Sequence, residues 1–129
     1  MATNGLTIKN GVLTKCDENF RGSLIIPDGV VSIGESAFED CDGLFSVTIP
    51  NSVESIGDSA FSDCTGLTSI TIPDSATSIG DGAFSGCQKL LYICYEGTEA
   101  QWNRVVKGYN WAEGVANKFV RCRDGVVAI

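Results

Sequence analysis

Residues Ile49–Thr71 read IPNSVESIGDSAFSDCTGLTSIT, and a closely similar stretch stands on each side of them. IPDGVVSIGESAFEDCDGLFSVT precedes them at Ile26–Thr48, and IPDSATSIGDGAFSGCQKLLYIC follows at Ile72–Cys94. The proline, the IG glycine, the phenylalanine, the cysteine and the leucine of each copy recur every 23 residues. Three copies at one fixed period predict a solenoid, because each copy must stack on its neighbours to bury its apolar side.

The end of each copy predicts a β-strand. It reads L-x-x-Φ-x-Φ, where Φ is mostly aliphatic, and alternation with period two is typical of a strand. The proline that follows has no N–H group for a sheet, so it ends the strand. We therefore expect a parallel sheet of about four strands, beginning at Leu24 and ending at Tyr95. In the middle copy we expect a bend at Gly57 and a short helical turn over Asp58–Asp63.

The segment before the repeats predicts a capping β-hairpin. Leu6–Ile8 and Val12–Cys16 alternate on either side of Asn10-Gly11, a pair typical of type I′ hairpin turns. This hairpin would cover the apolar end of the first repeat, as the terminal units of a solenoid must do.

The segment after the repeats predicts a helix. Thr98–Gln101 fits a capping box, and Trp102, Val105 and Val106 then lie on one apolar stripe. Lys107-Gly108 would end this helix, with a cation in its last turn and a glycine after it.

A second hairpin is expected at the end of the chain. Phe119–Cys122 and Val126–Ile129 are apolar or alternating segments on either side of Asp124-Gly125. We expect Trp111, together with Trp102, to seal the last repeat.

The repeats resemble the leucine-rich repeats of the BspA-like family, whose pattern is IPxSVxxIGxxAFxxCxxLxxIT. The resemblance covers residues 24–96, and it implies an α/β solenoid that is short and right-handed. It implies one domain over 1–129, with an N-terminal hairpin cap (1–23), the three repeats and a closing strand (24–96), and a C-terminal helix-plus-hairpin cap (97–129). It also implies a bacterial protein, secreted or at the cell surface, that adheres to host or bacterial proteins.

Composition excludes several classes of function. The net charge is −7 with a pI near 4.4, which argues against binding to nucleic acids or anionic membranes. The chain has no histidine, which removes histidine-activated nucleophiles and histidine metal sites. No apolar run reaches the roughly 20 residues of a membrane span. Met1–Asn4 lacks the pattern of a signal peptide, so a cytoplasmic location is an open alternative.

The repeat cysteines are expected to be packed thiols. Cys41, Cys64 and Cys87 occupy one repeat position, so they should form a column inside the solenoid, where three members could not all pair. Cys16, Cys94 and Cys122 fall outside this column. If a disulfide exists, Cys94 with Cys122 is the best candidate.

Two acidic columns are also expected, one of Glu35, Asp58 and Asp81 and the other of Asp40 and Asp63. Clustered carboxylates can bind Ca²⁺, but no loop with calcium-ligand spacing accompanies these acids. We favour the interpretation that these carboxylates accept hydrogen bonds from free N–H groups at the start of a turn. No metal site and no cofactor is predicted.

The outward face of the sheet is the candidate binding site. Three rows of equivalent positions should lie on it: Ile25, Thr48, Thr71 and Cys94; Ser23, Ser46, Ser69 and Tyr92; and Gly22, Phe45, Thr68 and Leu91. Serine and threonine are ordinary on an exposed strand, whereas exposed Phe45, Leu91 and Tyr92 favour a contact site. The binding residues predicted are Ser23, Ile25, Phe45, Ser46, Thr48, Ser69, Thr71, Leu91 and Tyr92.

No catalytic constellation is present in the sequence, because no acid is paired with a base and no glycine pattern matches a phosphate loop. The predicted function is therefore a non-catalytic protein-binding module, a monomer or weak homo-oligomer, with a host or bacterial surface protein as its ligand. The alternative is a structural spacer or self-associating unit without a separate ligand.

Overall fold

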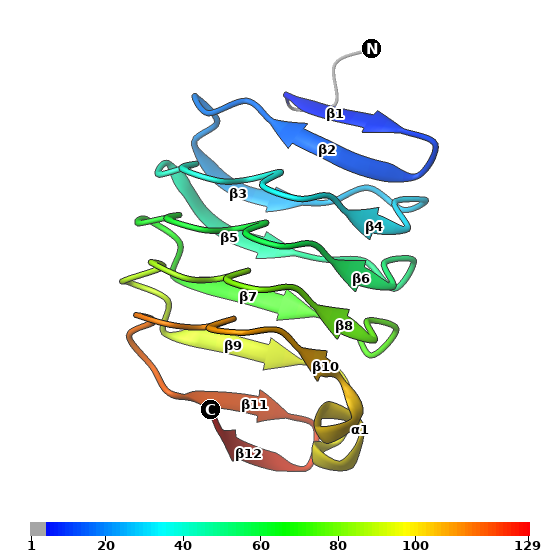
Figure 1. The fold of residues 1–129 in the computed structure, drawn as a ribbon, viewed down its shortest axis with the longest axis vertical. Coiled ribbons are helices and arrows are strands. Elements are labelled where there is room, and N and C mark those ends of the chain that lie inside the picture. Colours follow the sequence, from blue (N-terminus) through cyan, green and yellow to red (C-terminus); the bar gives the residue numbers. More distant parts are fainter. Residues whose placement is uncertain (1–4) are drawn as a thin grey trace.

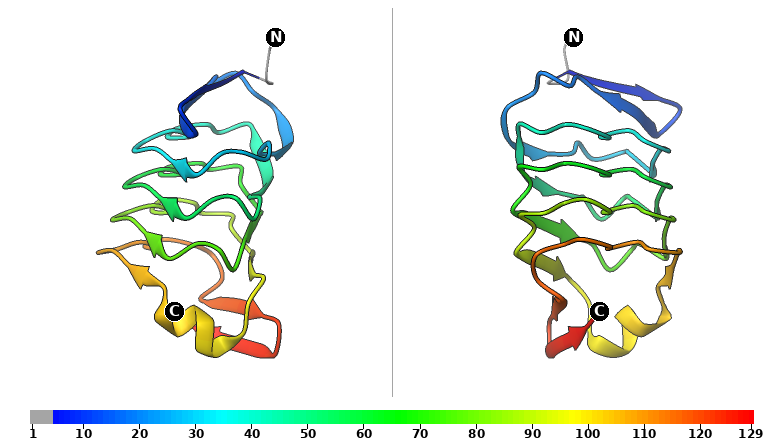
Figure 2. Two further views of the ribbon diagram at one scale, coloured as in Figure 1. Left: turned by 90° about the vertical axis from the view of Figure 1, so that its right-hand side faces the viewer. Right: turned by 60° about the vertical axis from the view of Figure 1, so that its left-hand side comes forward.

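The computed structural model describes residues 5–129; Met1–Asn4, where no signal-peptide pattern is found, lie outside the described residues. The chain winds into a solenoid of about five turns, with two sheets in which successive coils pair in parallel and with little helix (Figure 1). Figure 2 shows the coils stacked along the long axis, with a hairpin at each end.

Within residues 5–129 the structure has two six-stranded sheets. The one with the longer strands, here called the main sheet, contains the strands that the repeats predict. Its order is β12-β11-β9-β7-β5-β3, with these bounds: β3 Gly22–Ile25, β5 Leu44–Thr48, β7 Ser69–Ile72, β9 Tyr92–Tyr95, β11 Phe119–Cys122 and β12 Gly125–Ala128. Val47 pairs with Leu24 on one side and Ile70 on the other, which confirms the expected register. The prediction of about four strands omitted β11 and β12, which continue the sheet beyond β9.

A second sheet, here called the minor sheet, is not predicted by the sequence. Its order is β1-β2-β4-β6-β8-β10, with these bounds: β1 Leu6–Lys9, β2 Val12–Cys16, β4 Ser32–Ile33, β6 Ser55–Ile56, β8 Ser78–Ile79 and β10 Val106–Lys107. Each repeat contributes only the Ser-Ile pair before its IG glycine. A segment of two residues is too short for its sequence to alternate visibly. These strands can therefore be recognised only by their pairing with the neighbouring coils.

The N-terminal hairpin is confirmed and its second strand joins the minor sheet. β1 and β2 pair antiparallel around Asn10 and Gly11, whose φ angles of 52° and 80° suit a type I′ turn. Val12 and Leu13 then pair in parallel with β4. The hairpin therefore extends the stack of the repeats and covers its first coil.

The third side of each coil is a run of turns, and the short helix expected over Asp58–Asp63 is wrong. Ser59 and Asp63 have φ angles of 56° and 59°, which a right-handed helix does not allow. The amides on this side bond to the next coil instead, as when Phe61 N–H donates to the carbonyl of Ala83 at 2.7 Å. Stacking satisfies backbone groups that a single turn of helix would leave free.

A column of aromatic rings runs through the core. Phe38, Phe61 and Phe84 are fully buried and stacked nearly parallel, with ring centroids 4.7 and 5.2 Å apart. Trp111 continues the column, edge-on to Phe84 at 6.2 Å, and contacts Trp102 at 5.6 Å. The two tryptophans close the apolar end of the third repeat as predicted.

The C-terminal helix is shorter than predicted. Helix α1 spans Glu99–Arg104 and has the predicted capping box, but its C-cap Val105 is already extended. Val106 is 69% exposed, so it does not belong to the apolar stripe. Lys107 donates to the carbonyls of Trp102 and Val105 at 3.0 and 2.7 Å, and these bonds end the helix early. No helix in residues 5–129 could cross a membrane.

The segment after α1 forms one further coil, although its sequence has lost the 23-residue period. Val106 pairs with Ser78 in the minor sheet, and Phe84 N–H donates to the carbonyl of Trp111 at 2.7 Å. Val120 pairs with Ile93 in the main sheet. This coil lies more than 23 residues from its neighbour because α1 is inserted between β9 and β10.

The cysteine column has four members. Cys41, Cys64 and Cys87 are fully buried, as predicted, and all six cysteines are free thiols. The Sγ atoms of Cys64 and Cys87 donate to the carbonyls of the phenylalanines in the preceding coils at 3.0 and 3.1 Å. The prediction that Cys16 lies outside the column is wrong: it is buried beside Cys41, whose Sγ lies 4.0 Å from the carbonyl oxygen of Cys16. The hairpin contributes an additional layer that the period does not reveal.

The candidate disulfide between Cys94 and Cys122 is not formed. Cys94 pairs with Arg121, so Cys122 is displaced by one position along the neighbouring strand. Because side chains alternate across a sheet, Cys94 points outward and Cys122, which is buried, points into the core. The two sulfur atoms lie on opposite faces.

Thiol titration tests the column. A hydrogen bond that the protonated Cys16 thiol makes to the Cys41 side chain, together with burial, raises the pKa of Cys16, and the equivalent bond of Cys64 to Cys87, together with burial, raises that of Cys64. We expect only the half-buried Cys94 to react rapidly with a thiol reagent in native protein at pH 8, and all six cysteines to react after denaturation. Cys94→Ser should abolish the rapid phase. Rapid reaction of the column thiols in the folded protein would contradict this packing.

Truncating Trp102 tests the C-terminal seal. Trp102 is buried against Tyr95 and Trp111, so Trp102→Ala should lower the free energy of unfolding by about 3–5 kcal/mol in a denaturant titration. Tyr109→Ala removes an aromatic ring that is 78% exposed in the same coil, and should leave the midpoint nearly unchanged. Equal midpoints for the two variants would show that Trp102 does not close the core.

Candidate functional site

The predicted binding residues lie on the outer face of the main sheet. Ser23, Ser46, Ser69 and Tyr92 are register partners, and so are Ile25, Thr48, Thr71 and Cys94. These two rows confirm the predicted alignment. The third row is partly wrong: Gly22 pairs with Leu44, because an irregularity after Gly22 shifts the register and leaves Phe45 as an extra residue in its strand.

Large apolar side chains are exposed at both ends of this face. Ile25 is 74% and Phe45 55% exposed near the N-terminal end, and Tyr92 is 58% and Leu91 45% exposed near the other end. The residues between them are the small serines and threonines of β5 and β7. The face therefore combines apolar ends with a hydroxyl-bearing centre.

The hydroxyl groups of this face are partly engaged with each other and with the backbone. Ser46 Oγ donates to Ser23 Oγ at 2.8 Å, and Thr68 Oγ1 donates to the carbonyl of Phe45 at 3.1 Å. These bonds run from one coil to the next. They hold the short side chains close to the sheet, so that a partner could approach its surface.

The sequence did not predict that β11 and β12 extend the face. Phe119 and Val126 are 51% and 55% exposed, and with Arg121, Tyr92 and Leu91 they help to line a small hollow. Arg121 has no ion-pair partner within residues 5–129. Its alternation with Phe119 is visible in the sequence, which predicts a capping hairpin here but not an extension of the sheet.

In the first acidic column, Asp58 and Asp81 bind backbone amides. Asp58 Oδ1 accepts from the N–H of Asp81 at 2.8 Å, and Asp81 Oδ1 accepts from the N–H of Tyr109 at 2.7 Å. Each carboxylate therefore stabilises the coil that follows. Asp40 and its counterpart in the next repeat have left-handed φ angles, which aspartate tolerates better than most residues. No group of three or more metal-ligating residues is found within the described range.

A separate cleft of about 160 Å³ lies between α1 and the segment after β7, away from the outer face of the main sheet. The ring of Tyr95 packs against Trp102 with centroids 5.1 Å apart, and its side chain lines the cleft. Burial, together with the charge of Asp74, raises the pKa of Tyr95. The hydroxyl group is therefore a hydrogen-bond donor at neutral pH.

Solved structures with this architecture are known from several bacteria. A leucine-rich repeat protein of Bacteroides capillosus is 28% identical, with a TM-score of 0.74 over 95% of this chain and 97% of that chain. One from Bacteroides ovatus is 25% identical, with a TM-score of 0.68 over 95% of this chain. The T. pallidum leucine-rich repeat protein is 32% identical, with a TM-score of 0.58 over 65% of this chain. The alignments span only 40% of the T. pallidum chain and 37% of the B. ovatus chain.

No curated protein matches the sequence. The family model described as the BspA type leucine rich repeat region matches residues 6–102, which include the N-terminal hairpin, all three repeats and the start of α1. Because this match covers most of the chain and agrees with the stacked coils, the protein belongs to the BspA-type leucine-rich repeat family.

Proposed function

We propose that this domain is a non-catalytic protein-binding module that uses the outer face of the main sheet. The observation that carries the proposal is the gathering of six exposed apolar side chains on this one face: Ile25, Phe45, Leu91, Tyr92, Phe119 and Val126. Exposed apolar groups of this kind mark interaction sites on soluble proteins. The other exposed large apolar residues, such as Tyr109, lie elsewhere.

The charge of the face supports a protein partner. The chain has a net charge of −7, yet within residues 5–129 the outward-pointing strand residues of the main sheet include only one charged side chain, Arg121. Interface centres are poor in charged residues and rich in aromatic residues and arginine. Tyr92, Phe119 and Arg121 supply this combination around the hollow at the C-terminal end of the sheet. A protein segment with an acidic group opposite Arg121 would be complementary to it.

The place of action proposed is a bacterial cell surface, with a host or bacterial surface protein as the ligand. This follows from the family's role in adhesion and from the lack of a catalytic arrangement in the sequence. The alternative is a self-associating unit, in which the same face would meet a second copy.

The experiment starts with affinity capture by the intact chain from bacterial surface fractions and host matrix proteins, followed by affinity measurements on the captured protein. Thr48→Arg and Thr71→Arg place a bulky charge at the centre of the face and should weaken binding by about 2 kcal/mol or more. Tyr92→Ala should weaken it similarly by removing an aromatic anchor.

The matched control is Thr65→Arg, the same substitution at an exposed position on the third side of the solenoid. It should leave affinity unchanged, as should Glu35→Arg on the acidic column. Sedimentation velocity over a range of concentrations distinguishes the alternative, because self-association through the face would be abolished by Thr48→Arg. Undiminished binding by the folded face variants, with loss in Thr65→Arg or Glu35→Arg, would place the site on another side.

A further inference from the structure

We propose that the cleft between α1 and the Pro73–Thr77 segment binds the carboxylate group of a small ligand, either a free amino acid or the C-terminus of a peptide. This site is distinct from the main-sheet face. It exists because the last coil replaces the Pro-containing segment of the repeats with α1. In earlier coils the equivalent segments contact each other directly, as when Ser75 Oγ donates to the carbonyl oxygen of Val53 at 2.7 Å. Here the helix leaves a gap.

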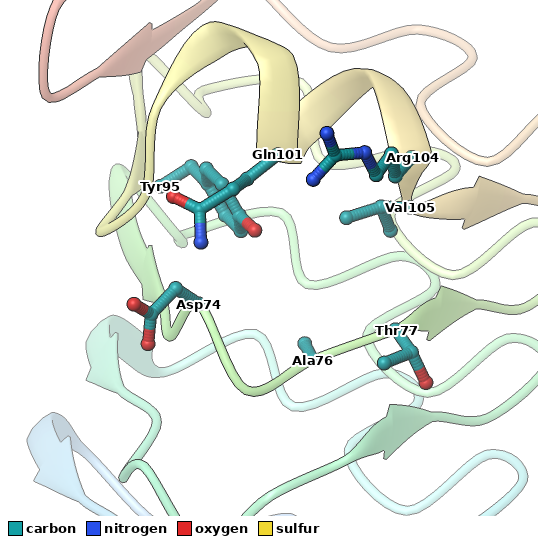
Figure 3. A pocket seen from close by; sticks show the side chains of 7 residues that line it. All are labelled: Asp74, Ala76, Thr77, Tyr95, Gln101, Arg104 and Val105. Atoms are coloured by element: carbon teal, nitrogen blue, oxygen red, sulfur yellow. The ribbon is translucent and has the colours of Figure 1, made fainter.

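Three hydrogen-bond donors line the cleft, as Figure 3 shows. The Oε1 atom of Gln101 accepts from the N–H and the hydroxyl of Thr98, at 2.8 and 3.2 Å. Its amide nitrogen lies on the side facing Asp74 and takes no part in the capping box (Figure 3). Tyr95 supplies its hydroxyl group from the back of the cleft.

Arg104 supplies the positive charge. Its guanidinium group projects over the cleft in Figure 3, and it has no ion-pair partner within residues 5–129. This is notable in a chain with 16 acidic and 9 basic residues. Asp74 lines the same cleft, but its ion pair is with Arg123, at 3.9 Å. An unpaired guanidinium beside two neutral donors suits a carboxylate, which accepts several hydrogen bonds at once.

The volume of the cleft and the residues on the side opposite α1 restrict the ligand further. A volume of about 160 Å³ admits a group the size of one amino-acid residue. Ala76 and Val105 give the floor apolar atoms, which would contact a short aliphatic part. Asp74 adds a negative charge on the wall formed by the third repeat, so a ligand that also carries an ammonium or N–H group would be preferred over a simple carboxylate.

The test is a titration of the isotope-labelled full chain followed by amide chemical shifts. Acetate, glycine and N-acetyl-dialanine are the carboxylate probes, and glycine methyl ester is the probe without a carboxylate. We expect saturable shifts at Thr77, Tyr95 and Gln101 with the first three and none with the ester. Tighter binding of glycine than of the peptide would identify a free amino acid as the ligand, and the reverse order would identify a peptide terminus.

Two variants make the assignment specific. Arg104→Gln should weaken glycine binding about tenfold or more, because it removes the charged donor. Arg21→Gln, which changes an exposed arginine at the other end of the solenoid, should leave binding unchanged. Tyr95→Phe keeps the ring beside Trp102 and should weaken binding several-fold through loss of the hydroxyl.

Thermal melting of each variant checks that it remains folded. The proposal is overturned if no carboxylate probe gives saturable shifts at the cleft, if the ester shifts the same amides equally, or if Arg104→Gln binds glycine as the unsubstituted chain does.

Discussion

Backbone hydrogen bonds between one coil and the next determine the structure of this protein. They run along both sheets and along the third side, where Phe61 N–H meets the carbonyl of Ala83. Because the three repeats pair with one offset of 23 residues, their equivalent side chains form columns. The buried phenylalanines and cysteines then fill the interior, while the serines and threonines of the main sheet are held on its outer face. Core and candidate binding face therefore depend on one register.

The 23-residue period was sufficient to predict the features that repeat. It predicted the four central strands, their register, the column of repeat cysteines and two of the three outward rows, because position in the period alone decides which way a side chain points. It could not predict the minor sheet, whose two-residue strands exist only through contacts with neighbouring coils. The predicted helix over Asp58–Asp63 is a run of turns. The spacing of the buried residues Ala60, Phe61 and Cys64 fits a helix and a run of turns equally well, and the sequence does not show the left-handed φ angles that rule out the helix.

The ends of the stack were harder to predict because they do not repeat. Cys16 joins the cysteine column from a hairpin that lies outside the period. Trp111 stands at the position of Ala60 and Ala83 in the hydrogen-bond register, and its ring closes the phenylalanine column edge-on. Phe119 and Arg121 point outward because β11 is a further strand of the main sheet. The same insertion opens the cleft beneath α1. Departure from the repeat is thus what distinguishes the C-terminal end of this solenoid from its centre.

Native-state hydrogen exchange of the amides of Phe38, Phe61 and Phe84 tests the stacking most directly. Each of these N–H groups donates to the coil that follows it, and for Phe84 the acceptor is Trp111 in the coil without repeat sequence. The stack predicts slow exchange at all three, with comparable protection, because they open only when neighbouring coils separate. Rapid exchange at Phe84 alone would show that the last coil does not stack on the repeats, and would contradict the continuous solenoid described here.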